Sequence, residues 1–260
     1  ILHQLLGWEM PVYAHVPLIL NPDKTKLSKR KGDVSVDTFL EKGYLPEALI
    51  NFLALLGWNP TSDREIFSRQ ELIELFDLSC VNRSGAVLNV EKLDWTNAQY
   101  IKQMDKITYL EHCRLVTATM SLEVVDDAMI ERVCCMVKDR VQRFQEIPGL
   151  VTFIFQDTLV YDPQLLHWKI QSTEEVRERL MACRDWITEV SEEVFSSVEG
   201  LDRALRTWIA LRGWGNGDTL WPLRVALSGA KQSPSPFELL YVYGRERALQ
   251  RIDAALGKIG

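Results

Sequence analysis

Apolar residues recur at steps of three and four from about residue 105 to the end of the chain. This period places them on one face of an α-helix, as in helices that pack against a core. The spacing predicts helices at about 128–147, 174–190, 201–212, 219–228 and 236–256. We expect Pro148-Gly149 to end the first of these helices. We also expect Pro236 to lie in the first turn of the last helix and Gly244 to break that helix in two.

The N-terminal residues show shorter patterns. Apolar positions within residues 1–8 indicate the last turns of a helix, with Gly7 as its stop. Because the chain opens with neither Met nor a capping residue, we expect it to begin inside an element of a longer protein. Residues 11–20 form an apolar, β-leaning run that predicts a buried strand. His15, inside this run, is interpreted as a packing residue or as support for a neighbouring site.

Two helix signals follow. Pro46 opens a strongly apolar run that stops at Gly57, which predicts a helix over these residues. Ser68 and Glu71 have the spacing of a capping box, in which each residue bonds the backbone N–H of the other. Residues 58–100 otherwise mix short helices and loops, and we place a domain boundary near residues 103–106.

The composition is that of an ordinary globular protein, with 47% hydrophobic and 25% charged residues among 260. No apolar run approaches the roughly 18 residues of a membrane span, so we expect no membrane partner. The net charge of −6 argues weakly against a general nucleic-acid binder, although it leaves room for local basic patches. The five cysteines form no C-x-x-C pair, which predicts reduced, buried thiols and no metal site.

One loop concentrates positive charge. Five cations fall between Lys24 and Lys31, in a polar loop that follows the predicted strand and extends from Asn21 to Asp33. Ligands bind at strand ends in α/β sheets, and mobile ammonium groups there can follow a polyphosphate as its charge changes during reaction. The alternative is a solvated basic loop or a contact to a phosphate backbone.

The residues of this loop resemble a known signature. Lys26-Leu27-Ser28-Lys29-Arg30 is similar to the K-M-S-K-S motif of class I aminoacyl-tRNA synthetases, and the run Tyr13 to Gly32 resembles its glutamyl-tRNA synthetase form. The resemblance continues in order through residues 36–39, 43–51, 87–97, 220–229 and 233–238. It implies that Lys26 and Lys29 act on the ATP phosphates. It also implies that all five signature residues, Lys26, Leu27, Ser28, Lys29 and Arg30, bind ATP.

The resemblance implies a mainly α fold in three parts. Residues 1–32 would be a short remnant of an α/β catalytic domain that includes the loop. Residues 33–104 would form an α+β region that contacts the tRNA stem, and residues 105–260 an all-helical anticodon-binding region. The family's H-I-G-H signature is absent from the sequence, so we expect this chain alone to be unable to form glutamyl-adenylate.

The resemblance also implies residues that contact tRNA. Arg140 aligns with the family arginine that recognises the third anticodon letter, and Arg224 aligns with a contact to another anticodon base. The turn residues aligned with further contacts are Ser233, Pro234, Ser235 and Pro236, of which we select Ser233, Pro234 and Pro236 as binding residues. The N–H groups of the helix after the turn would be free to meet RNA. The alternative for both arginines is a surface salt bridge.

Two further residues have the position of family contacts to the inner tRNA stem. These are Trp95 and Lys102, although Trp95 is equally consistent with a core residue because it alternates with Leu93. The tryptophans that we expect to be packing residues are Trp58, Trp168, Trp186, Trp208 and Trp214.

The leading hypothesis is a portion of a glutamate–tRNA ligase with ATP, as its Mg²⁺ complex, as a substrate. Its partners would be tRNA(Glu) and, in the parent enzyme, L-glutamate. We expect a cytoplasmic monomer with no DNA partner. The alternatives are a free-standing tRNA-binding module without catalysis and a helical interaction domain that binds no RNA.

Overall fold

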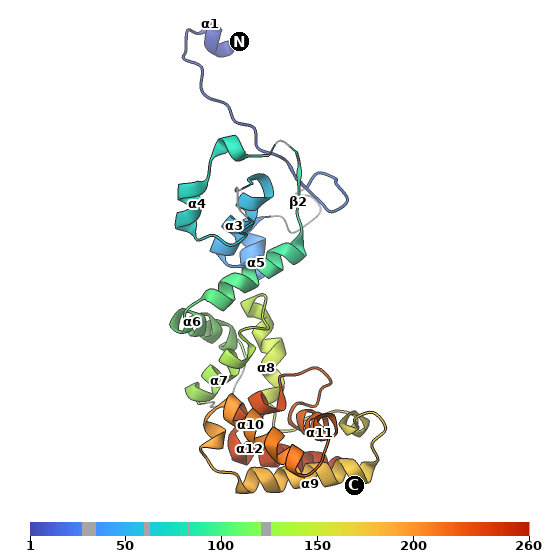
Figure 1. Ribbon diagram of the computed structural model, residues 1–260. Helices are drawn as coiled ribbons and strands as arrows, with labels where there is room; N and C mark the ends of the chain where they lie inside the picture. Colours follow the sequence, from blue (N-terminus) through green and yellow to red (C-terminus); the bar gives the residue numbers. More distant parts are fainter. Residues whose placement is uncertain (28–34, 60–62, 83, 121–125, 260) are drawn as a thin grey trace. The chain divides into compact units, whose positions relative to one another are not determined.

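The computed structural model describes residues 1–27, 35–59, 63–82, 84–120 and 126–259. Ser28, Lys29 and Arg30 of the signature lie outside these residues. The chain divides into two compact units. Unit 1 comprises Ile1–Tyr109 and Val141–Gln145, and unit 2 comprises Leu110–Arg140 and Glu146–Gly260. In both units helices predominate among the described residues, so the prediction of a mainly α fold is confirmed (Figure 1).

Unit 1 contains short helices and one small sheet. Its helices are α1 (Leu2–Leu5), α2 (Val36–Glu41), α3 (Pro46–Gly57), α4 (Arg69–Leu75), α5 (Val90–Gln103) and the start of α6 (Lys106–Thr117), with the 3-10 turn η2 (Leu78–Cys80). The strands β1 (Ile19–Leu20) and β2 (Ala86–Val87) pair in parallel, with Ile19 opposite Ala86. The helix predicted at residues 46–57 is confirmed, with Pro46 in its first turn. The capping box of Ser68 and Glu71 is confirmed at the start of α4.

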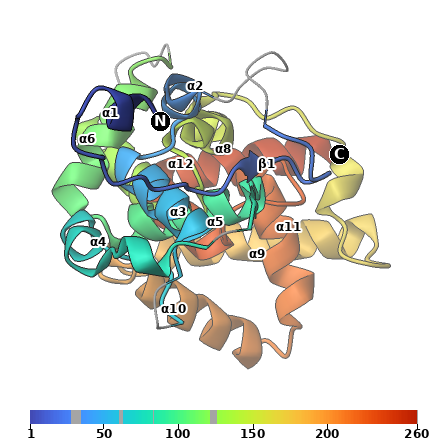
Figure 2. The same cartoon turned by 90° about the horizontal axis from the view of Figure 1, so that it is seen from above.

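The core of unit 1 lies between α3 and α5, which pack side by side (Figure 2). One buried cluster consists of Tyr44, Leu49, Phe52 and Leu93. A second consists of Trp58, Phe67 and Leu72, and it joins the end of α3 to α4. Burial of such large apolar side chains is the main favourable contribution to folding. The packing role expected for Trp58 is therefore confirmed.

Two buried asparagines bond backbone groups in unit 1. Asn51 on α3 donates to the carbonyl of Glu65 and accepts from the N–H of Phe67, at 2.8 and 2.9 Å. Asn97 on α5 accepts from the N–H of Leu45 at 2.8 Å and donates to the carbonyl of Gln142. Buried backbone groups without a partner are costly, so these two side chains keep irregular segments attached to the core.

Gly43 allows the residues 141–145 to approach the turn before α3. Its φ of +88° lies in the left-handed region, which favours glycine. A β-carbon at this position would overlap the side chain of Gln145. Any side chain at Gly43 would therefore impose strain and also displace Gln145.

Helices are the only regular secondary structure in the described residues of unit 2. It contains the end of α6 and α7 (Asp127–Val137), α8 (Ile147–Phe155), α9 (Thr173–Glu189), α10 (Val198–Leu211), α11 (Asn216–Ser228) and α12 (Pro236–Lys258), with 3-10 turns η4 (Pro163–Leu166) and η5 (Val194–Ser196). The 3-10 turn η3 (Phe144–Glu146) precedes α8. Helices α9, α10, α11 and α12 pack together (Figure 1). The helices predicted near 174–190, 201–212, 219–228 and 236–256 are confirmed, including the break at Gly244, where φ is +67° and ψ is 179°.

The prediction of one helix over residues 128–147 is wrong. Helix α7 ends at Val137, and Pro148-Gly149 lie in the first turn of α8 instead of ending a helix. Proline is tolerated in a first turn because the N–H that it lacks would have had no partner inside the helix. The apolar period continues through Val141 and Phe144 because both are buried, although they lie between the two helices.

Two arginines of α12 occupy the C-terminal ends of other helices. Arg245 donates to the carbonyls of Ile187, Thr188 and Val190 at the end of α9. Arg251, which is buried, donates to the carbonyls of Phe153, Gln156 and Asp157 at the end of α8. The last carbonyls of a helix have no partner inside the helix and carry partial negative charge, so a guanidinium group stabilises both ends.

The expected buried strand at residues 11–20 is wrong except at its end. Only Ile19–Leu20 form a strand, and Val12 and Val16 are exposed. His15 is exposed as well. Strands are buried when a larger sheet is covered on its faces by other layers. In the described part of the chain this run pairs with one strand, β2, over two residues, so most of the run has no sheet around it.

The cysteines are free thiols, as expected, but two of the five are exposed. Cys113, Cys134 and Cys183 are buried, whereas Cys80 and Cys135 are exposed. Burial raises the pKa of Cys183 to about 12. In the described ranges, no three His, Cys, Asp or Glu side chains are grouped to hold a metal ion. No helix in those ranges is both long and apolar enough to cross a bilayer.

Candidate nucleic-acid interface

The polar loop from Asn21 to Asp33 is called the lysine loop below. Its described part, residues 21–27, is a tight turn beside the small sheet. The N–H of Asn21 donates to the carbonyl of Thr25 at 2.8 Å, and Asp23 accepts from the N–H and hydroxyl groups of Thr25. Lys24 has a φ of +65° in this turn. The chain then returns antiparallel to β1, with Lys26 opposite Leu20. Lys26 is exposed, so its ammonium group is accessible from solvent.

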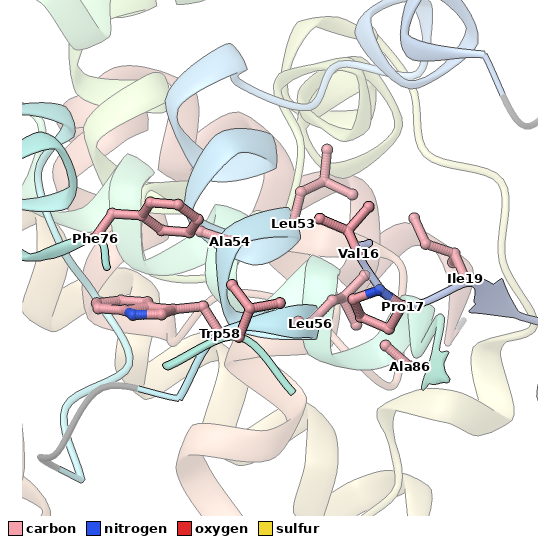
Figure 3. Close-up of a pocket in the computed structure, with 11 residues that line it drawn as sticks. Val16, Pro17, Ile19, Leu53, Ala54, Leu56, Trp58, Phe76 and Ala86 are labelled. Atoms are coloured by element: carbon pink, nitrogen blue, oxygen red, sulfur yellow. The ribbon is translucent and has the colours of Figure 1, made fainter. Parts of the chain in front are cut away.

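An apolar cavity of about 410 Å³ lies near this sheet (Figure 3). Val16 and Pro17 face α3 across it, and Trp58 and Phe76 close one side. None of its described lining residues is charged. Phosphate groups are usually bound by cations or by several N–H donors, and these apolar side chains offer only the indole N–H of Trp58, which is buried without a partner in the described structure. The ATP contacts of the lysine loop stay a prediction.

Arg140 is held by a carboxylate from a distant helix. Its Nη1 and Nη2 atoms donate to Oε1 and Oε2 of Glu238 at 2.8 and 2.9 Å, in a bidentate pair. Nη1 also donates to the carbonyl of Met136. The side chain of Arg140 is 40% exposed and that of Glu238 is 19% exposed. A salt bridge, which was the alternative interpretation of Arg140, is therefore present, and it leaves part of the guanidinium group open to solvent.

Glu238 is ionised despite being half-buried. Burial acts to raise its pKa, but hydrogen bonds from Arg140 and Ser235, together with the positive charge of Arg140, outweigh burial. The net effect is a pKa below the ordinary value for a glutamate. The carboxylate is thus charged at neutral pH and remains a strong acceptor for Arg140.

The turn before α12 is joined to the same glutamate. Ser235 and Glu238 form a capping box, in which the N–H of Ser235 donates to Oε2 of Glu238 at 2.7 Å and Ser235 Oγ accepts from the N–H of Glu238. The N–H of Glu238 is therefore not free for RNA, contrary to expectation. Pro234 and Pro236 are buried, whereas Ser233 and Ser235 are partly exposed. The serines are thus the parts of this turn that solvent can reach.

Arg224 contacts the same loop from α11. Its Nη2 atom donates to the carbonyl of Lys231 at 2.8 Å. Its guanidinium group lies 4.6 Å from the ring centre of Trp221, which packs on Trp168 with ring centres 4.8 Å apart. Stacking on an aromatic face fixes the plane of a guanidinium group. The structure therefore brings Arg140, Arg224 and the turn 233–236 to one loop, residues 229–238, which we call the 229–238 loop.

Trp95 and Lys102 lie on the surface of unit 1. Trp95 is 39% exposed, so the interpretation of it as a core residue is wrong. The ammonium group of Lys92 lies 4.0 Å from its ring centre. Lys102 is exposed two turns further along α5, on the same face as Trp95 because seven residues span about two helical turns.

Sequence reasoning did not identify Glu238 or Asn97 as important positions. Glu238 has the capping-box spacing from Ser235, and this local signal was available. Its pairing with Arg140 joins residues 98 positions apart, for which the sequence has no local signal. Asn97 was noted only as part of a resemblance, and its two backbone partners also lie far along the chain.

Two family models match the chain in succession. The model for tRNA synthetases class I (E and Q), catalytic domain, matches residues 1–95, and the model for the anticodon binding domain matches residues 98–256. Together the matches indicate part of a class I aminoacyl-tRNA synthetase of the glutamate and glutamine type.

Individual relatives narrow this class. The chain is 36% identical to the glutamate–tRNA ligase of Lachnoclostridium phytofermentans, over 99% of this chain and 52% of that protein. A solved glutamate tRNA ligase from Elizabethkingia meningosepticum, in complex with its amino acid, matches with a TM-score of 0.84 and 29% identity, over 100% of this chain and 54% of that one. The glutamate-tRNA synthetase of Elizabethkingia anophelis matches with a TM-score of 0.81 and 30% identity, over 98% and 53% of the two chains. The chain belongs to the glutamyl-tRNA synthetase family and corresponds to its C-terminal portion. It spans about half the length of the curated relatives that it matches.

Proposed function

We propose that this chain supplies the ATP-phosphate loop and the tRNA-recognition surfaces of a glutamate–tRNA ligase. The ligase joins L-glutamate to tRNA(Glu) and converts ATP, bound with Mg²⁺, to AMP and pyrophosphate. The observation that supports the tRNA part most directly is the convergence of Arg140, Arg224 and the turn 233–236 on the 229–238 loop. Trp95 and Lys102 on α5 would contact the tRNA stem. We propose a cytoplasmic monomer.

The ATP part of the proposal rests on the lysine loop. Lys29, with Lys26 assisting, would neutralise the charge that develops on the departing pyrophosphate. Leu27, Ser28 and Arg30 would complete the loop around the phosphates. The exposed position of Lys26 beside β1 supports this role.

The donor pattern of Arg140 supports recognition of a cytosine. Among the described residues, the Nε–H of Arg140 has no hydrogen-bond partner, and Nη2 uses only one of its two hydrogens. These two N–H groups form one edge of the guanidinium group. Cytosine presents two adjacent acceptors, N3 and O2, on its pairing edge, whereas guanine presents two donors there. Glutamate codons begin with G and glutamine codons with C, so the third anticodon letter is C for glutamate and G for glutamine.

Binding of tRNA to this chain tests the proposal. We expect tRNA(Glu) transcripts with C at the third anticodon position to bind about 10-fold more tightly than those with G, since a bidentate arginine contributes ~1–3 kcal/mol to base discrimination. Arg140→Gln should abolish the preference. Arg184→Gln is the matched control, because Arg184 also pairs with a carboxylate, Asp253, and is similarly exposed. Equal affinity of the unsubstituted chain for both transcripts would remove the anticodon-recognition role.

A chimaera tests the ATP loop. The chain is fused behind the N-terminal half of the Lachnoclostridium ligase, and adenylate formation is measured by pyrophosphate exchange. We expect Lys29→Ala to lower the rate of adenylate formation more than it weakens ATP binding. Lys24→Ala, in the same loop but outside the signature, is the control and should retain most of the activity. An unchanged rate for Lys29→Ala would exclude this lysine from the mechanism.

The match of residues 1–95 to a synthetase catalytic-domain model does not favour a free-standing tRNA-binding module. The other alternative, a helical interaction domain without RNA, predicts no saturable tRNA binding at all. The same titration therefore tests it.

A further inference from the structure

We propose that Glu238 is a positioning residue that sets which edge of Arg140 faces the anticodon and joins that arginine to the turn 233–236. This inference rests on the proposed role of Arg140 in recognising the third anticodon letter. It goes beyond that role because it assigns the selectivity of the site to a residue that need not touch RNA.

The contacts of Arg140 divide its five N–H donors into two sets. Glu238 takes one hydrogen each from Nη1 and Nη2, and the carbonyl of Met136 takes the second hydrogen of Nη1. The remaining donors are the Nε–H and the second hydrogen of Nη2. These two are adjacent and parallel, and they form the edge that suits two neighbouring acceptors.

Glu238 can orient Arg140 because its own carboxylate is fixed. Oε2 accepts from Nη2 of Arg140 and also from the N–H of Ser235, at 2.9 and 2.7 Å. The side chain is 19% exposed, so rotation away from Arg140 would break the helix cap and expose a packed group. An ordered donor loses less conformational entropy on binding than a free arginine does.

This arrangement predicts an effect on selectivity that exceeds the effect on general affinity. A free arginine would present either edge to a base, and it would bind phosphates as well as bases. With Glu238 in place, the edge of Arg140 that is formed by Nη1 and Nη2 is occupied, and only the edge formed by Nε and Nη2 remains. Because Glu238 also caps the turn, Arg140 and Ser235 keep a fixed separation within the 229–238 loop.

The test measures dissociation constants of the full chain for the two transcripts with C or G at the third anticodon position. Glu238→Gln is nearly isosteric, but its amide has one oxygen and one NH2 group, so it can no longer accept from both Nη1 and Nη2 of Arg140. We expect it to reduce the roughly 10-fold preference for C to about 3-fold or less, with a smaller change in affinity for the G transcript. The matched control is Glu175→Gln. Glu175 forms the same capping box with Ser172 at the start of α9, and among the residues that the structure describes it makes no ion pair with a basic side chain.

Further variants separate orientation from charge. Arg140→Lys keeps the positive charge, but an ammonium group has no pair of parallel N–H donors. We therefore expect this variant to lose the preference for C even though Glu238 is intact. The double variant Arg140→Gln with Glu238→Gln should show the same preference as Arg140→Gln alone, because Glu238 acts only through the arginine. Thermal melting of each variant, followed by circular dichroism, verifies that unit 2 remains folded.

The outcomes separate this inference from the proposed function. If Arg140→Gln abolishes the preference for C but Glu238→Gln retains it, the proposed function stands and the positioning role is wrong. The same conclusion follows if Glu238→Gln and Glu175→Gln weaken both transcripts equally, since that would be a purely structural effect. If Arg140→Gln leaves the preference unchanged, both the anticodon role of Arg140 and the role of Glu238 are wrong.

Discussion

Two residues close together in sequence, Arg140 and Gln142, are anchored in different units by different chemistry. Gln142 is bonded in unit 1 through its carbonyl to Asn97, a neutral side chain with 0% exposure. Arg140 is bonded in unit 2 to Glu238, a charged side chain that is 19% exposed. The hydrogen bond between Asn97 and Gln142 is shielded from solvent, whereas the Arg140–Glu238 pair leaves N–H groups of Arg140 open to it.

The difference agrees with the proposed roles, in which the buried hydrogen bonds of Asn97 serve stability and the Arg140–Glu238 pair serves recognition. A buried amide gains its full benefit because its partners would otherwise lose hydrogen bonds to water. A half-exposed ion pair contributes less, because water and salt screen it. The benefit of the Arg140–Glu238 pair is geometric, since it holds the N–H groups of the Arg140 guanidinium in one orientation at the surface.

The largest effect is expected from Asn97→Ala in unit 1. This substitution leaves the buried N–H of Leu45 and the carbonyl of Gln142 without their partner, and it opens a small cavity. We expect the free energy of unfolding to fall by about 2–4 kcal/mol, measured by urea denaturation. Asn97→Asp retains the acceptor for Leu45, but it loses the donor to Gln142 and buries a charge, so it should also destabilise the unit. A loss below that of Glu238→Ala would contradict this ranking.

A smaller effect is expected from Glu238→Ala in unit 2. It removes both the cap of α12 and the partner of Arg140, and we expect a loss of about 1–2 kcal/mol in the free energy of unfolding. The control is Glu175→Ala, which removes a cap of the same kind without an arginine, and its loss should be smaller. Equal losses for the two variants would show that the ion pair with Arg140 adds nothing to stability.

The pH dependence sharpens the contrast further. Because the pKa of Glu238 is lowered in the folded state, its ionised form stabilises unit 2. That contribution is complete above the pKa of a glutamate in the unfolded chain and is lost as pH falls through the lower folded pKa. The stability difference between the unsubstituted chain and Glu238→Gln should therefore shrink between neutral and acidic pH. The corresponding difference for Asn97→Ala should change little, because an amide does not titrate in this range.

The smallest expected effect is that of salt. Raising NaCl from about 0.05 to about 1 M shortens the Debye length from over 10 Å to about 3 Å. We expect the stability difference between the unsubstituted chain and Glu238→Gln to fall by a few tenths of a kcal/mol. The difference for Asn97→Ala provides the control and should not follow this trend. A salt effect of the same size on both would mean that screening of the Arg140–Glu238 pair is not its cause.

Elements with local start and stop signals could be predicted from the sequence. Helix α3 extends from Pro46 to Gly57 as expected, because proline favours a first turn and the apolar face between them is continuous. The break at Gly244 was predictable for a similar reason, since glycine readily adopts the positive φ found there.

Features that depend on tertiary contacts could not be predicted in this way. The apolar period continued past Val137, so the end of α7 was hidden, because Val141 and Phe144 are buried without being helical. In the candidate site, Arg140 was found by resemblance. Its partner Glu238 was not, because the pair forms only when helices far apart in the sequence pack together.

The arginines of α12 have a consequence for the order in which the protein is made. Arg245 and Arg251 satisfy carbonyls at the ends of α9 and α8, which precede them by 55 or more positions. A ribosome releases the chain from the N-terminus at about 5–20 residues per second. During those seconds the two earlier helices emerge with bare C-terminal ends, so we expect them to stay frayed until α12 emerges from the exit tunnel. Packing of α12 thus completes the C-terminal ends of two helices that are synthesised before it.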